Sequence, residues 1–255
     1  MNEITSSTKI LRVVVGLLAA GLLVTAGLVG YAYSFSPTSI RKPTAGHPHM
    51  RLQLVVSGKE VDFGATKFQT PYAKDVCTAK LTAEPIHFHD GLGQFVHIHW
   101  TGVTGGMLLK NYGWNLIGGP DGSLGYRFDQ LPKIIKVPIH GKALPARSPD
   151  ARFFIYTGDE SSYKLRNWNQ FLDEDIQTFI SGKTVGRNSL LNSIIPVASA
   201  HNEPTGTGAS EEELIKLNDV IGNAVIFVQK DAPTDAQIKD RFNDLIALPE
   251  SVCGG

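Results

Sequence analysis

The sequence has only two cysteines and three methionines in 255 residues, and it carries no net charge. Lysine plus arginine and aspartate plus glutamate each total 24, and no run of five like charges occurs. Binding to nucleic acid phosphates needs a basic surface, so we expect no nucleic-acid partner. The few methionines argue against a copper(I) site made of thioethers. The catalytic motifs Gly-x-Ser-x-Gly, His-Glu-x-x-His and Cys-x-x-Cys are also absent.

The two cysteines, Cys77 and Cys253, lie far apart in the sequence. In an oxidising compartment we expect them to form one disulfide that pins the C-terminal end to the early part of the domain. Closing so long a loop would stabilise the fold by restricting the unfolded chain. The alternative is two unrelated thiols, and the spacing leaves both interpretations open.

Charge is nearly missing from the N-terminal segment, where Arg12 is the only charged residue between Ile10 and Tyr33. A helix needs roughly 20 apolar residues to cross a bilayer, whereas the apolar part of a secretory signal has about 7–15. We therefore expect an uncleaved signal anchor over residues 10–35, in contact with the lipid bilayer. Cleavage as a signal peptide is the alternative, although residues 31–34 are a poor cleavage context.

The flanks of this segment suggest its orientation. Residues 1–9 form a short tail, which normally stays in the cytoplasm, although the positive-charge bias across the span is slight. Residues 36–46 hold two prolines and several small polar residues, which is typical of a stalk. Residues 47–255 would then form the extracytoplasmic domain of a single-pass membrane protein.

Polar and apolar residues alternate from His49 onward, which predicts a half-buried strand that ends at Ser57. The same reasoning predicts further strands at 151–158 and 223–230, and helices at 104–113, 166–181, 210–221 and 234–246. Strands and helices do not alternate regularly. We therefore predict an α+β domain with a mostly antiparallel sheet and about four helices, in which residues 210–255 could form a subdomain.

Histidine is arranged in a distinctive pattern. Six of the eight histidines form His-x-His pairs, namely His47/His49, His87/His89 and His97/His99. Random placement would give roughly a quarter of one such pair. Residues two apart in a strand point to the same face, so each pair aims two imidazoles in one direction.

The second and third pairs flank a turn-like segment, residues 90–94, and together predict a β-hairpin. In one register His87 lies opposite His97, and the apolar residues form a single continuous face: Ile86, Phe88, Val96, Ile98 and Trp100. In the other register His87 lies opposite Val96, and both faces mix histidine with apolar residues. Burial of one face favours the first register, which gathers the histidines on the opposite face.

We therefore predict a transition-metal site with the ligands His87, His89, His97 and His99. Glu84 and Asp90 are further candidates, as ligands or as acceptors for imidazole N–H groups, and His47 and His49 could join the site if their strand is a neighbour. Neutral imidazole suits zinc, copper(II), nickel and iron, and zinc or copper(II) is the expected metal. Four histidines would make a closed structural or storage site, whereas three with an open position would suit a zinc enzyme that activates water.

Other interpretations of the histidines remain open. The pairs could form a pH-sensitive patch, or they could be plain polar surface, as we expect for His140 and His201. If the pairs are plain surface, the domain would be a cell-surface interaction module with incidental histidines.

The stretch HFHDG…VHIHW resembles membrane-anchored bacterial and archaeal proteins with a His-x-His-Asp-Gly turn. This resemblance covers residues 47–115 and implies no particular activity. VHIHW is also similar to the zinc-ligand strand of α-type carbonic anhydrases, which would imply a zinc enzyme. However, the Glu-x-His-x-x-His-Trp pattern and the Gly-Ser-Glu-His-Thr segment of that family are absent. Cupins also begin with His-x-His, but their spaced glutamate and second histidine motif are missing.

Overall fold

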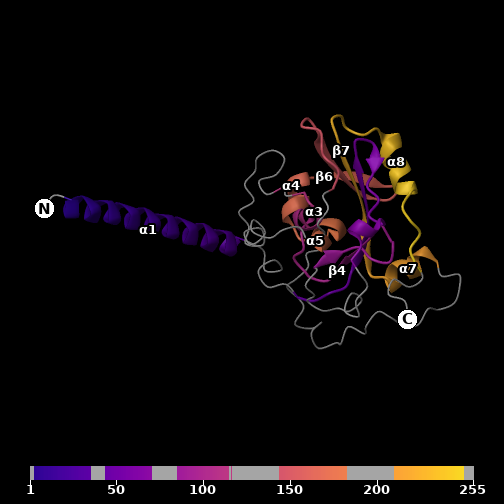
Figure 1. Cartoon of the computed structure of the whole chain (residues 1–255). Helices are drawn as coiled ribbons and strands as arrows, with labels where there is room; N and C mark the ends of the chain where they lie inside the picture. Colours follow the sequence, from indigo (N-terminus) through magenta and orange to yellow (C-terminus); the bar gives the residue numbers. More distant parts are fainter. Residues whose placement is uncertain are drawn as a thin grey trace, which may run out of the picture.

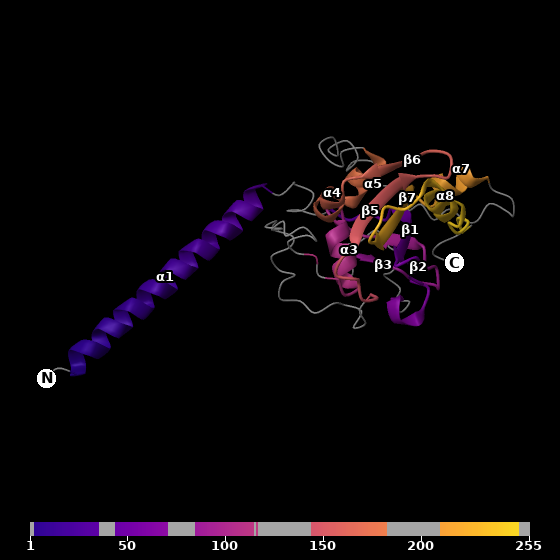
Figure 2. The ribbon, with the colours of Figure 1, turned by 90° about the horizontal axis from the view of Figure 1, so that it is seen from above.

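The computed structural model describes residues 3–35, 44–70, 85–114, 116, 144–182 and 210–249. Helix α1 (Glu3–Phe35) precedes a domain in which a β-sheet lies between two groups of helices (Figures 1 and 2). Within α1, Thr8–Tyr31 is long and apolar enough to cross a membrane, a property that signal sequences share. The helix begins at Glu3, before the predicted start at Ile10.

The sheet has the strand order β3-β4-β1-β7-β5-β6, and β2 pairs with β1. The strands are β1 (His49–Val56), β2 (Lys59–Glu60), β3 (Ile86–His87), β4 (Phe95–Ile98), β5 (Arg152–Gly158), β6 (Tyr163–Arg166) and β7 (Val220–Gln229). β1 and β7 run parallel, and every other pairing between these strands is antiparallel. The prediction of an α+β domain with a mostly antiparallel sheet is therefore confirmed.

Helices cover both faces of this sheet (Figure 2). One face carries α3 (Gly105–Asn111), α4 (Trp168–Asp173) and α5 (Ile176–Ser181), and the other carries α7 (Glu211–Leu217) and α8 (Asp235–Asn243). A short 3-10 helix, η1 (Thr66–Phe68), follows β2.

All eight residues of β1 are buried, so the prediction of a half-buried strand was wrong. Arg51 and Gln53 lie under the second helix layer instead of facing solvent.

Three predicted helices differ from those observed, and the one predicted over 234–246 already ends at Asn243. The helix predicted over 166–181 is split into α4 and α5, because the Asp175 side chain caps α5 by accepting from the Thr178 N–H. The same carboxylate accepts from the Gly102 N–H, which ties the break to the start of α3. The helix predicted to reach Ile221 ends at Leu217, because Val220 already pairs with β1. The capping boxes that begin α7 and α8 are confirmed.

Strand β7, which belongs to the suggested subdomain 210–255, lies between β1 and β5 in the same sheet. Several predictions fall outside the described residues. These are the Cys77–Cys253 disulfide, the role of Glu84, the surface histidines His140 and His201, and most of the stalk.

Candidate metal centre

The hairpin histidines meet in the predicted register. β3 and β4 pair with His87 opposite His97 and Ile86 opposite Ile98. The apolar residues of the hairpin lie in the main core, where Trp100 is partly buried and four are completely buried: Ile86, Phe88, Val96 and Ile98. The chain reverses at Asp90 and Gly91, which both adopt positive φ.

Strand β1 brings a third pair of histidines, His47 and His49, next to the hairpin. His49 pairs with His97, so that His87, His97 and His49 lie side by side on three adjacent strands. The remaining three rings contact this row, with centroids 4.6 Å apart for His47 and His49. Apart from His47, which is partly buried, the paired histidines are only 0–3 % exposed. The interpretation as plain surface is therefore wrong for these five residues.

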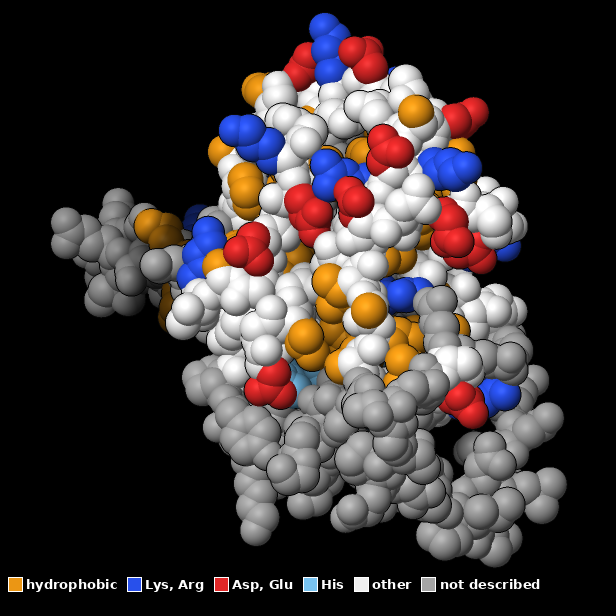
Figure 3. Space-filling view, turned by 90° about the vertical axis from the view of Figure 1, so that its right-hand side faces the viewer, with side chains coloured by type: hydrophobic (Ala, Val, Ile, Leu, Met, Phe, Trp, Pro, Cys, Tyr) orange, Lys and Arg blue, Asp and Glu red, His pale blue; other side chains and the backbone are white. Residues whose placement is uncertain are grey.

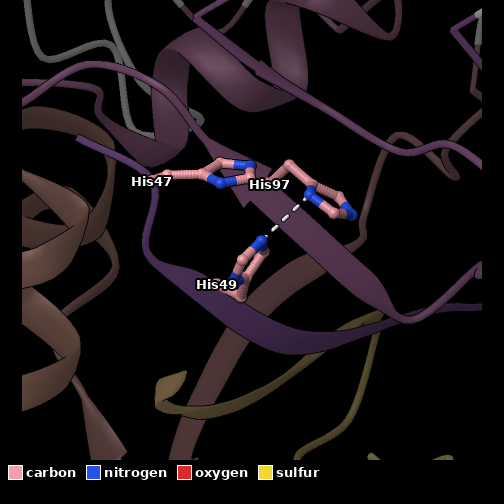
Figure 4. A group of neighbouring side chains, drawn as sticks. All are labelled: His47, His49 and His97. Atoms are coloured by element: carbon pink, nitrogen blue, oxygen red, sulfur yellow. Dashed lines mark hydrogen bonds between the residues drawn. The ribbon is translucent and has the colours of Figure 1, made fainter. Parts of the chain in front are cut away.

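His97 lies at the centre of this histidine cluster, which comprises His47, His49, His87, His89, His97 and His99. Its Nδ1 lies 3.0 Å from Nε2 of His49 and 3.2 Å from Nε2 of His89 (Figure 4 shows the first contact). Ligand nitrogens of His47, His49 and His97 all lie within 4.8 Å of one another. Two nitrogens bound to tetrahedral zinc at about 2.0–2.1 Å are about 3.3 Å apart. The cluster could therefore hold a metal ion.

The outer nitrogens of two imidazoles are held by acceptors. Nδ1 of His49 donates to the backbone carbonyl of Asn218, and Nδ1 of His89 lies 2.7 Å from Oδ2 of Asp90. A neutral imidazole that donates from Nδ1 carries its lone pair on Nε2. Both Nε2 lone pairs consequently face His97, in the orientation that supporting acceptors impose on metal-ligating histidines.

At Nδ1 of His97, three imidazole nitrogens meet with too few protons for each contact to be a hydrogen bond. This Nδ1 faces the lone pairs of His49 and His89, so one proton at most serves all three nitrogens. Nε2 of His97 is buried, and no group among the described residues hydrogen-bonds it. A metal cation in place of the shared proton could bind the lone pairs of these nitrogens.

Burial favours the neutral form of two imidazoles in the cluster, His89 and His97. Burial lowers the pKa of His97 well below its ordinary value of 6.5, and the neighbouring histidines lower it further. Burial also lowers the pKa of His89, although the hydrogen bond and the charge of Asp90 oppose this effect. Neutral imidazole is the form that binds metals, so both side chains are ready to act as ligands at neutral pH.

The structure changes the emphasis within the predicted ligand set. His87 and His99 belong to the cluster through ring stacking, with centroids 4.9 Å apart. The short nitrogen contacts of His97 are made instead by His89, from the predicted set, and by His49, which the sequence offered only as an additional candidate. Which histidines bind the metal stays a prediction.

Sequence reasoning missed Asn218 altogether. Its contribution is a backbone carbonyl 169 positions away from His49, and no side-chain motif could reveal such a contact.

Comparisons with protein-family models, curated proteins and solved structures find no match for this chain.

Proposed function

We propose that this chain is a membrane-anchored extracytoplasmic protein that holds one transition-metal ion in the histidine cluster. The observation that carries this proposal is the position of His97 Nδ1 within 3.2 Å of two other imidazole nitrogens. The ligands come from His47, His49 and His97, whose ligand nitrogens all lie within 4.8 Å of one another, and from His89, whose Nε2 lies 3.2 Å from Nδ1 of His97.

The donor atoms favour zinc or copper(II). The described side chains at the cluster offer imidazole nitrogen and one carboxylate, Asp90, which contacts His89 rather than pointing at the other rings. Imidazole nitrogen suits zinc and copper(II), whereas magnesium and calcium prefer sets of oxygen atoms.

The proposal of a single ion follows from electrostatics. Six imidazoles are more than the four ligands that a tetrahedral ion needs. However, two divalent ions about 6 Å apart would repel each other by about 11 kcal/mol at an effective dielectric constant of 20. Imidazoles are neutral and cannot offset this repulsion. The remaining rings, His87 and His99, then shield the bound ion and fix the orientation of its ligands.

Burial supports holding the metal over catalysis on it. A zinc enzyme needs an open coordination position that substrate can reach. His49, His89 and His97 are 0–3 % exposed, and His47 is partly buried. Helix α1 supports the membrane location, because Thr8–Tyr31 matches a bilayer span in length and composition. The domain after it would lie outside the cytoplasm.

The test is the metal content of the full chain, purified in detergent and equilibrated with zinc or copper(II). We expect one equivalent per chain in the native protein and nearly none in His97→Gln. His201→Gln, which changes a histidine outside the His-x-His pairs, serves as the matched control and should keep one equivalent. A native protein without metal, or a His97→Gln variant that folds and keeps its full equivalent, would overturn the proposal.

A further inference from the structure

Asn218 connects three parts of the molecule. It follows the last residue of α7, and it is only 5 % exposed. Its backbone carbonyl accepts the hydrogen bond from Nδ1 of His49. Its side-chain Nδ2 donates to the carbonyls of Leu214, at 3.0 Å, and Pro249, at 2.9 Å. Both amide protons are therefore used, one on helix α7 and the other on the C-terminal segment.

That segment, residues 244–249, is called the C-terminal strap below. At its middle, the N–H of Ile246 donates to Oε1 of Gln94 at 2.8 Å, and Nη1 of Arg51 donates to the Ile246 carbonyl at 3.2 Å. Gln94 lies in the loop just before β4, and Arg51 lies in β1. The strap is thus fixed to the strands that carry His97 and His49.

The strap also packs next to the histidines. Leu248 is 6 % exposed and lies in one apolar cluster with Phe95, whose ring stacks on His49 with centroids 4.8 Å apart. The partly exposed members of this cluster are Leu92, Leu214, Ile215, Val220 and Ile246. Figure 3 views this side of the molecule and shows hydrophobic side chains gathered near a histidine. His49 is consequently held from two directions, through its Nδ1 and through its ring face.

We infer that Asn218 is a positioning residue through which the C-terminal strap regulates how long the metal stays bound. This inference rests on the proposed function. With the strap in place, the Asn218 carbonyl keeps the His49 proton on Nδ1 and the lone pair on Nε2. When the strap leaves, Asn218 loses its Pro249 partner and Phe95 loses its Leu248 cover. His49 can then change tautomer or turn away, and the metal dissociates faster.

The first test measures zinc release from the loaded full chain to a chelator in excess. Asn218→Ala keeps the backbone carbonyl that accepts from His49 but removes the side-chain hydrogen bonds that fix it to α7 and to the strap. Leu248→Ala loosens the strap without changing a histidine. We expect both variants to release zinc about 10–100-fold faster, the usual effect of removing support from a metal ligand.

Matched controls separate this effect from general destabilisation. Asn167→Ala removes a helix N-cap on the opposite face of the sheet, and Ile238→Ala opens the apolar cluster under α8, which contains no histidine. Both should leave the release rate unchanged. Equal release rates in all four variants and the native chain would overturn the inference and leave the proposed function intact. A native chain that binds no zinc would overturn both.

A second measurement detects positioning without metal. Nitrogen-15 NMR of the metal-free chain distinguishes imidazoles protonated on Nδ1 from those protonated on Nε2. In Asn218→Ala we expect His49 to become a mixture of both tautomers, while His89, held by Asp90, stays protonated on Nδ1. An unchanged His49 signal in Asn218→Ala would contradict a positioning role.

Discussion

Nε2 of His49 lies 3.0 Å from Nδ1 of His97, across two paired strands. Both side chains are buried away from water. The pair defines where a metal ion would sit, because ligand nitrogens of one tetrahedral ion have nearly this separation. Nε2 of His89 also lies 3.2 Å from Nδ1 of His97.

The two parts of the histidine cluster should differ in their effect on metal binding. His49→Gln removes a nitrogen that contacts His97 Nδ1, whereas His87→Gln removes a ring that stacks on His97 with centroids 5.6 Å apart. We expect His49→Gln to abolish stoichiometric zinc binding and His87→Gln to retain it with weakened affinity. Isothermal titration of zinc into both variants measures this difference. The reverse order of affinities would place the ion at the hairpin pairs His87/His89 and His97/His99.

Removing the carboxylate beside His89 should weaken metal binding without unfolding the turn. Asp90 adopts a φ of 58°, in the left-handed region that asparagine tolerates well. Asp90→Asn therefore keeps the turn but loses the charge that supports His89. We expect about a 10-fold rise in the zinc dissociation constant, measured by competition with a chelator. An unchanged constant would show that His89 is not a ligand.

The stability of the metal-free chain should fall in acid. The pKa values of His97 and His89 are lowered in the folded state, so below pH 6.5 the unfolded chain binds more protons than the folded chain. Their contribution to the free energy of unfolding is therefore fully present above pH 6.5. It decreases as the pH falls toward the lowered pKa values of the two histidines. Each histidine contributes a slope of up to about 1.4 kcal/mol per pH unit. Urea unfolding at several pH values measures this slope, and His97→Gln should reduce it. Stability that rises in acid would contradict the burial of neutral imidazoles.

Gln53 gives a prediction about stability alone. It is 1 % exposed in β1, and neither its amide nitrogen nor its amide oxygen has a hydrogen-bond partner among the described residues. Gln53→Met should leave the free energy of unfolding unchanged or raise it by about 1 kcal/mol, because it removes two buried polar atoms. Gln53→Glu should lower it, because it buries a carboxylate. Urea unfolding compares the two variants. A large loss in Gln53→Met would mean that the amide has a partner in the folded chain.

The membrane anchor is tested by the mass of the mature chain. We expect the protein to remain in the membrane fraction after alkaline extraction and to retain residues 1–35, as an uncleaved anchor requires. Intact-mass spectrometry of the extracted protein measures this directly. A mature chain that begins near residue 35 would identify the segment as a cleaved signal peptide.

The sequence predicted the parts of the fold that depend on short-range patterns. The alternation of Ile86, Phe88, Val96 and Ile98 was sufficient to predict the register that places His87 opposite His97. The capping boxes at Ser210 and Thr234 identified two helix starts, because both partners lie within four residues.

Long-range contacts account for what the sequence did not predict. His49 joins the cluster because β1 pairs with β4, and Arg51 and Gln53 are buried because α8 and the C-terminal strap cover β1. The break at Asp175 depends on the Gly102 N–H, which is 73 positions away. None of these partners could be assigned without the assembled sheet.

X-ray absorption at the zinc edge tests the central claim most directly, because it reports the atoms bound to the ion. For the zinc-loaded full chain we predict three or four imidazole nitrogens at about 2.0–2.1 Å, and loss of this zinc signal in His49→Gln. A spectrum with sulfur ligands, or one dominated by oxygen without imidazole scattering, would contradict a metal centre at His97.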